Sequence, residues 1–146
     1  MNRSLCITML FCCALTLAGC SENPGSTDDS QAAEFLNTTW RLQSIVFSDS
    51  TIIQDDSNKA FNIRFFEDLQ VRGIADCNDY FGIYTISDNN SLSIDNLVSY
   101  FVLCSESIEQ RYLGALHFVH SYEISNNRLQ LYYDESNSTL NFLKSE

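Results

Sequence analysis

The sequence predicts an α+β domain in which one antiparallel β-sheet is combined with a single α-helix. From Phe35 onward, short apolar segments are separated by clusters of Asp, Asn, Ser and Gly, as in strands joined by tight turns. One later segment, residues 108–119, instead repeats its apolar residues with helical spacing. The remaining predicted elements are strands.

Period-two alternation predicts the strands and their inward faces. Asn126–Asn127 offers the positive φ angles of a two-residue hairpin turn, and Glu67–Asp68 and Asp88–Ser91 join two further pairs. In the last hairpin, five apolar residues should face one core: Leu129, Leu131, Tyr133, Leu140 and Phe142. The predicted strands are Thr39–Phe47, Phe61–Phe66, Gln70–Ala75, Phe81–Ser87, Leu92–Ile94, Tyr100–Leu103, Tyr122–Ser125, Arg128–Tyr133 and Thr139–Leu143.

The helix is predicted from an amphipathic stripe. Its apolar positions follow spacings of four, four and three residues, and Ser107 with Gln110 would form a capping box at its start. The stripe consists of Ile108, Tyr112, Leu116 and Val119.

The N-terminus has the layout of an export signal. Arg3 precedes an apolar run, Leu5–Ala18, which is shorter than the roughly 20 residues needed to span a bilayer. Leu17, Ala18, Gly19 and Cys20 resemble the lipobox of bacterial lipoproteins, which implies cleavage before Cys20 and lipid on that cysteine. An ordinary cleavable signal with a chance cysteine is the alternative.

The sequence therefore predicts three regions: a signal peptide over 1–19, a lipidated cysteine with a flexible tether over 20–34, and one domain over 35–146. The tether holds the only proline and nothing apolar larger than Ala. Such a chain would sit in the cell envelope, anchored to a membrane. Ser21 after the cysteine favours the periplasmic face of the outer membrane in a Gram-negative host.

The charge balance is strongly acidic. The chain carries 19 acidic against 8 basic residues, a net charge of −11. This argues against a nucleic-acid partner, and plain solubility explains the acidity without a cationic partner.

Six cysteines are present, but three lie in the predicted signal and Cys20 would carry lipid, which leaves Cys77 and Cys104. A disulfide between these two is the leading interpretation in an exported chain. A catalytic thiolate at Cys77 is disfavoured because Asp76 and Asp79 would raise its pKa. Asn78 is then interpreted as a turn residue that satisfies local amides.

Other polar groups have simpler interpretations than a site. His117 and His120 lie three residues apart on the predicted helix, but no third ligand with zinc-like spacing accompanies them, so surface histidines are favoured. The Asp- and Asn-rich segments 76–79 and 88–90 lack the pattern of a calcium loop and are predicted to be turns. No metal or cofactor is expected.

Several anchor residues resemble the META domain, a module of HslJ-like bacterial lipoproteins. Trp40 matches its opening W-x-L, and the segment RGIADCNDYFGIYTI is similar to its central motif, with Asp76 where glycine is usual. The second similar segment is LCSESIEQRYLGALHFVHSYEISNNRLQLY, where Tyr100 replaces a frequent threonine upstream. The central motif residues are Gly73, Cys77, Asn78, Tyr80, Gly82 and Tyr84.

The resemblance implies a cracked, incomplete antiparallel barrel covered by one helix, and no enzymatic activity. Family members are described as envelope or stress-associated proteins. Two functions stay open: a non-catalytic accessory protein, expected to be a monomer, that binds another envelope protein, or a small barrel that holds an apolar ligand such as a lipid tail. For the first, Phe101 and Phe118 are the predicted exposed anchors.

Overall fold

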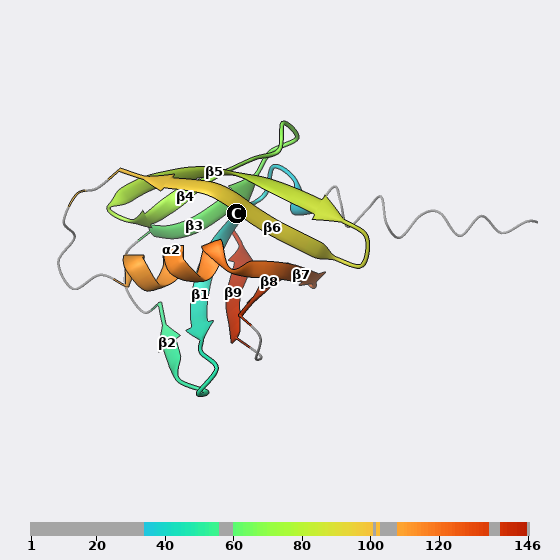
Figure 1. Cartoon of the computed structure of the whole chain (residues 1–146). Coiled ribbons are helices and arrows are strands. Elements are labelled where there is room, and N and C mark those ends of the chain that lie inside the picture. Colours follow the sequence, from blue (N-terminus) through green and yellow to red (C-terminus); the bar gives the residue numbers. More distant parts are fainter. Residues whose placement is uncertain (1–33, 56–59, 101, 103–107, 135–137, 146) are drawn as a thin grey trace, which may run out of the picture.

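The computed structural model describes residues 34–55, 60–100, 102, 108–134 and 138–145, and these form strands with one labelled helix (Figure 1). The elements in chain order are β1 (Thr39–Val46), β2 (Ile52–Gln54), β3 (Ala60–Phe65), β4 (Gln70–Asp76), β5 (Asn78–Ser87), β6 (Ser91–Ser99), α2 (Glu109–His117), β7 (Val119–Ser125), β8 (Arg128–Tyr133) and β9 (Ser138–Lys144).

The sheet closes into a barrel of eight antiparallel strands. The strand order is β1-β3-β4-β5-β6-β7-β8-β9, and β9 pairs back to β1, while β2 pairs with β1 outside this ring. The expected antiparallel sheet with one helix is therefore confirmed, but the expected incomplete barrel is wrong. Long-range pairing of this kind leaves no local trace in a sequence.

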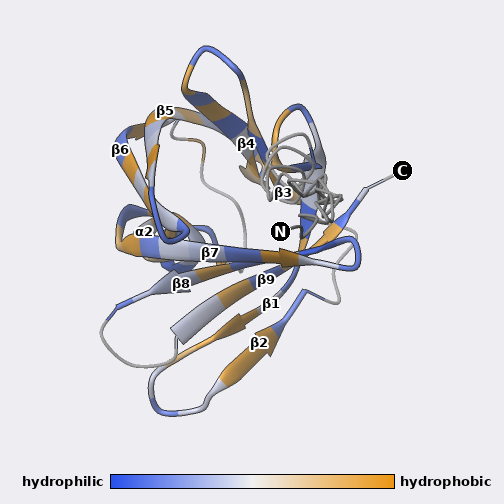
Figure 2. Cartoon of the chain, turned by 90° about the vertical axis from the view of Figure 1, so that its right-hand side faces the viewer, coloured by the Kyte–Doolittle hydropathy of each residue, from blue (hydrophilic) through white to orange (hydrophobic). Residues whose placement is uncertain are grey.

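The weakest seam of the barrel lies between β6 and β7. These strands share one registered pair, Ser91 with Ser121, supported by a bond from the Tyr122 amide to the Asn90 carbonyl oxygen at 3.0 Å. Helix α2 lies beside β6, between the upper strands β3–β6 and the lower strands β1 and β7–β9 (Figures 1 and 2). In the described part of the barrel, β6 and β7 are paired and leave no opening here, and α2 packs next to this short seam.

Aromatic and aliphatic side chains fill the barrel. Along β5, Tyr80 and Tyr84 are buried while Phe81 and Ile83 face outward, which is the expected alternation. The helix contributes three buried residues: Tyr112, Ala115 and Leu116. The largest fully buried side chains include Trp40, Tyr80, Tyr112, Phe35, Phe61, Phe65 and Phe142.

The predicted hairpins are present. Asn126 and Asn127 have φ angles of 50° and 62°, and Asn89 and Asn90 have angles of 61° and 57°, as left-handed turn positions require. Glu67 lies in the turn between β3 and β4. The five apolar residues predicted to line the inner face of the last hairpin are buried.

The start of the helix differs from the prediction. Helix α2 begins at Glu109 with Ile108 as its N-cap and no side-chain cap bond, so the capping box with Gln110 is wrong. Ser107 lies outside the described residues. The helix ends at His117, and Val119 already belongs to β7 because Phe118 leaves the helical path.

Strand β6 is longer than predicted, and Tyr100 and Val102 lie outside any strand. A bulge explains the error: Phe81 pairs with Val98 and Ile83 with Asp95, so Gly82 alone opposes two residues of β6, and Asn96 adopts a φ of 52°. Polar residues of β6 such as Asp95 and Asn96 therefore lie within the strand. The three-residue strand β2 was missed because its surroundings are short and polar.

In the described part of the chain, no helix is long and apolar enough to cross a membrane. The predicted signal, Cys20 and the tether up to residue 33 lie outside the described residues.

Candidate functional site

Asn78 lies at the centre of the family motif and is almost fully buried, with 1% of its surface exposed. Its Nδ2 donates to the Val102 carbonyl oxygen at 2.9 Å, and its Oδ1 accepts from the Val102 amide at 2.8 Å. The expected local turn role is therefore wrong. Asn78 starts β5 and pairs through its side chain with a backbone segment 24 residues away.

The same amide also holds the first turn of α2. Nδ2 of Asn78 lies 2.9 and 2.8 Å from the two carboxylate oxygens of Glu109, and the Ser99 hydroxyl donates to Glu109 Oε1 at 3.2 Å. A carboxylate in the first turn also interacts favourably with the helix dipole. The Asn78 side chain therefore connects β5, the end of β6, Val102 and the helix.

Gly73 and Tyr80 form the second part of the motif and face each other across β4 and β5. A Cβ at Gly73 would overlap the carbonyl oxygen of Asn62 and lie 2.5 Å from the Tyr80 hydroxyl oxygen. The hydroxyls of Tyr80 and Tyr112 lie 2.9 Å apart and donate to that same carbonyl, at 2.9 and 3.2 Å. Burial raises the pKa of both phenols.

The remaining motif residues also serve the fold. Gly82 faces the bulge of β6, where a Cβ would lie 2.9 Å from the Asp95 carbonyl oxygen. The Tyr84 hydroxyl donates to the Phe66 carbonyl at 2.8 Å, and Trp40 is fully buried. Asp76 has a φ of 63°, a conformation that glycine adopts without strain. This backbone geometry accounts for glycine being usual at that position.

Cys77 follows Asp76 and is exposed, with its Sγ 3.9 Å from the Val102 carbonyl oxygen. Val102 lies two residues before Cys104 in the chain. Cys104 and Phe101 lie outside the described residues, so the disulfide and the role of Phe101 stay predictions.

The two histidines do not share a helix as predicted. His117 ends α2, whereas His120 lies in β7, because the helix is shorter than its apolar stripe suggested. Both are exposed, and His120 Nε2 lies 3.1 Å from the Asp134 carbonyl oxygen. Across the described ranges, no group of three or more His, Cys, Asp or Glu could hold a metal ion.

An exposed apolar surface lies on the outer face of β5 and β6 and on the residue that follows β6. We call it the β5–β6 strip; it consists of Phe81, Ile83, Val98 and Tyr100, with exposed fractions of 43, 45, 49 and 67%. Phe81 and Val98 are cross-strand partners, and the rings of Phe81 and Tyr100 lie 6.4 Å apart. The sequence predicted Phe101 and Phe118 as exposed anchors and none of these four residues; Val98 was missed because the strand was predicted to end at Ile94.

The backbone around this strip is held in place. The Tyr100 amide donates to the Asp79 carbonyl oxygen at 3.1 Å. Asp79 is the residue after Asn78, whose side chain bonds to Val102. Val102, which is 60% exposed, is thus displayed next to the strip. Asn78 of the family motif therefore fixes the backbone that follows the strip.

Acidic groups flank the strip. Asp79 precedes Phe81 by two positions on the outer face of β5, and Asp95 pairs with Ile83; both carboxylates are exposed. Arg72 pairs with Phe81 from β4 and is also exposed. The surface is apolar at its centre and mainly acidic beside it.

Phe118, the second predicted anchor, is 65% exposed, as expected. It caps the C-terminus of α2, and its ring lies 5.1 Å from that of His117. It is not among the residues that form the strip.

In the described residues, the closed eight-stranded barrel with helix α2 defines the class of a small antiparallel β-barrel protein. The chain belongs to the META domain family, whose model matches residues 33–146. The predicted family is thereby confirmed.

Solved structures show the same fold. An NMR structure of a protein from Burkholderia xenovorans is similar with a TM-score of 0.68 and 22% identity, over 92% of this chain and 99% of that chain. A crystal structure of a duf4847 family protein from Bacteroides vulgatus has a TM-score of 0.58 and 16% identity, over 77% and 96% of the two chains. A search of curated proteins found no match.

Proposed function

We propose that this chain is a lipid-anchored envelope protein whose META domain binds another envelope protein through the β5–β6 strip and turns over no substrate. The observation that carries the proposal is the strip itself, where four apolar side chains share one outward face. Contiguous exposed apolar surface of this kind is typical of interaction sites. The lipobox and the tether support the anchor.

The proposed partner presents an apolar anchor surrounded by basic side chains. Phe81 and Tyr100 supply the aromatic surface that dominates binding energy at protein interfaces. Asp79 and Asp95 beside them, and the net charge of −11, favour a cationic rim on the partner. An anionic membrane surface fits less well, since the same charges would repel it.

The alternative, an apolar ligand inside the barrel, has less support. The barrel interior is occupied by packed rings, among them Phe35 on Phe65 at 4.1 Å and Tyr112 against Phe61 at 5.3 Å between centroids. A lipid tail would have to displace these side chains at a cost of several kcal/mol.

The test places a photo-crosslinking amino acid at Val98 in the full-length protein in its native envelope. Asp49, in an exposed turn away from the strip, is the control position. We expect one protein to be cross-linked from position 98 and not from position 49. Cross-linking to lipid, or to a second copy of this chain, would overturn the proposal.

The purified partner is then titrated with variants. Phe81→Ser and Tyr100→Ser should each weaken binding by about tenfold or more, with stronger binding at low salt. Phe118→Ser is the matched aromatic control, since Phe118 is about as exposed as Tyr100 but lies outside the strip. If Phe118→Ser abolishes binding and Phe81→Ser leaves it unchanged, the binding face is the helix end instead.

A further inference from the structure

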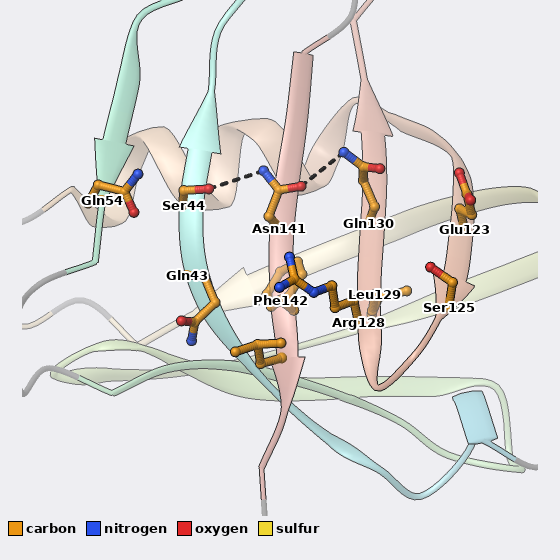
Figure 3. A pocket seen from close by; sticks show the side chains of 11 residues that line it. Gln43, Ser44, Gln54, Glu123, Ser125, Arg128, Leu129, Gln130, Asn141 and Phe142 are labelled. Atoms are coloured by element: carbon orange, nitrogen blue, oxygen red, sulfur yellow. Dashed lines mark hydrogen bonds between the residues drawn. The ribbon is translucent and has the colours of Figure 1, made fainter.

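A second surface, built from polar side chains, lies on the lower strands of the barrel. One residue from each of five neighbouring strands forms a continuous row: Gln54, Ser44, Asn141, Gln130 and Glu123 (Figure 3). Each is the registered partner of the next, so the row runs across β2, β1, β9, β8 and β7 with the spacing of strands, about 4.8 Å. We call it the polar row.

Hydrogen bonds within the row fix its central side chains. Asn141 Nδ2 donates to Ser44 Oγ at 3.1 Å, and Gln130 Nε2 donates to Asn141 Oδ1 at 2.9 Å. The Tyr132 hydroxyl lies 3.0 Å from both Gln130 Oε1 and Glu123 Oε2. These contacts orient the side chains before any ligand arrives, which lowers the entropic cost of binding.

The row retains hydrogen-bonding capacity after these contacts. The Ser44 hydroxyl hydrogen, the second Gln130 amide hydrogen and several Glu123 lone pairs are not used by them. Gln54 and Arg128 are exposed and make no side-chain hydrogen bond or ion pair with the described residues. Donors and acceptors are therefore both available on one surface.

These groups surround a hollow of about 460 Å³. Arg128 lies two positions before Gln130 in β8 and therefore on the same face of the sheet as the row, and Figure 3 shows it to one side of the row. The volume is within the range of small-ligand sites. Its lining is too polar for a lipid tail, because each buried polar group would lose hydrogen bonds to water.

We propose that this hollow binds a neutral saccharide chain. Sugar hydroxyls both donate and accept, so they match a row in which amides, a hydroxyl, a carboxylate and a guanidinium stand side by side. Glu123 accepts from hydroxyls while Arg128 donates to them. The net charge of −11 opposes acidic polymers and leaves neutral ones unaffected.

The site is separate from the β5–β6 strip. The polar row and Arg128 belong to β2, β1, β9, β8 and β7, whereas the strip is formed by β5, β6 and Tyr100, so the two sites share no residue. The saccharide proposal therefore does not depend on the proposed protein partner, and variants of the strip should leave it unchanged.

The test titrates the domain with maltotetraose and chitotetraose and follows the side-chain amide resonances of Asn141, Gln130 and Gln54 by NMR. We expect these signals to shift with at least one of the neutral probes at millimolar concentration, the range of weak saccharide affinities. Tetragalacturonate tests an anion site instead. Binding of tetragalacturonate alone would overturn the proposal, as would no shift with any probe.

Two variants and a matched control locate the binding. Gln54→Ala and Arg128→Ala should each lower the affinity for the neutral probe by about fivefold or more, because each removes hydrogen bonds to the ligand. Their thermal stability should not change, since both side chains are exposed. Arg72→Ala removes an exposed arginine from β4, across the barrel, and should bind like the parent. If all three variants bind the probe as tightly as the parent protein does, the hollow is not the binding site.

Discussion

The amide nitrogen of Asn78 lies 2.9 and 2.8 Å from the two carboxylate oxygens of Glu109, across 31 residues of chain. The same nitrogen bonds to the Val102 carbonyl, so its two hydrogens are shared among three acceptors. The pair attaches the start of α2 to the start of β5. It also holds the backbone that displays Val102 beside the β5–β6 strip.

Asn78→Ala should destabilise the domain by about 2–3 kcal/mol, because it removes a buried side chain that bonds to both the amide and the carbonyl of Val102 and donates to the Glu109 carboxylate. Urea unfolding measures the loss. A double-mutant cycle with Glu109→Ala should give a coupling energy of about 1–2 kcal/mol. Additive single effects would mean that the two side chains do not interact as described.

Gly73→Ala should destabilise the domain by about 3 kcal/mol or more, because the new methyl group would overlap the Asn62 carbonyl and the Tyr80 hydroxyl. Gly114→Ala is the matched control, since a Cβ there meets no atom within 4 Å and the residue lies in α2. This substitution should instead stabilise by about 1 kcal/mol. Equal thermal shifts for both variants would contradict the packing of Tyr80 on Gly73.

Stability should fall at alkaline pH because of Tyr80 and Tyr112. Burial raises the pKa of both phenols above the ordinary value of 10.0, so the folded state keeps protons that the unfolded state releases. The free energy of unfolding is then unaffected by these groups below pH 10.0 and decreases above it, by about 1.4 kcal/mol per pH unit for each phenol.

Urea unfolding between pH 8 and pH 11 measures this slope. Tyr112→Phe should reduce the slope by the contribution of one phenol, about 1.4 kcal/mol per pH unit. A slope that Tyr112→Phe does not alter would show that the buried pair does not govern the alkaline transition.

Lipidation at Cys20 is tested by metabolic labelling with a fatty acid. Cys20→Ala should abolish incorporation of the label and leave an uncut precursor, because the thioether precedes cleavage in lipoprotein processing. Cys6→Ala, within the predicted signal, is the control and should be labelled normally. Normal cleavage of the Cys20→Ala protein would instead indicate an ordinary export signal.

Local patterns in the sequence determined the elements whose causes are themselves local. Alternation placed Leu129 and Leu131 inside, because a strand turns successive side chains to opposite faces. Asn126 and Asn127 specified their turn through the positive φ angles that they tolerate. The glycines of the motif were identified only by resemblance, and the atoms that approach them became known from the structure.

Tertiary structure alone decided how these elements meet. Closure through Ser91 and Ser121, and the bonds from Asn78 to Glu109 and Val102, join residues 24 to 31 positions apart, and no sequence period records such contacts. Bulges shift the register by one residue, which hid the outward position of Val98. The polar row arises in the same way: its five residues are unremarkable in their own strands and become a surface only when the pairing register aligns them.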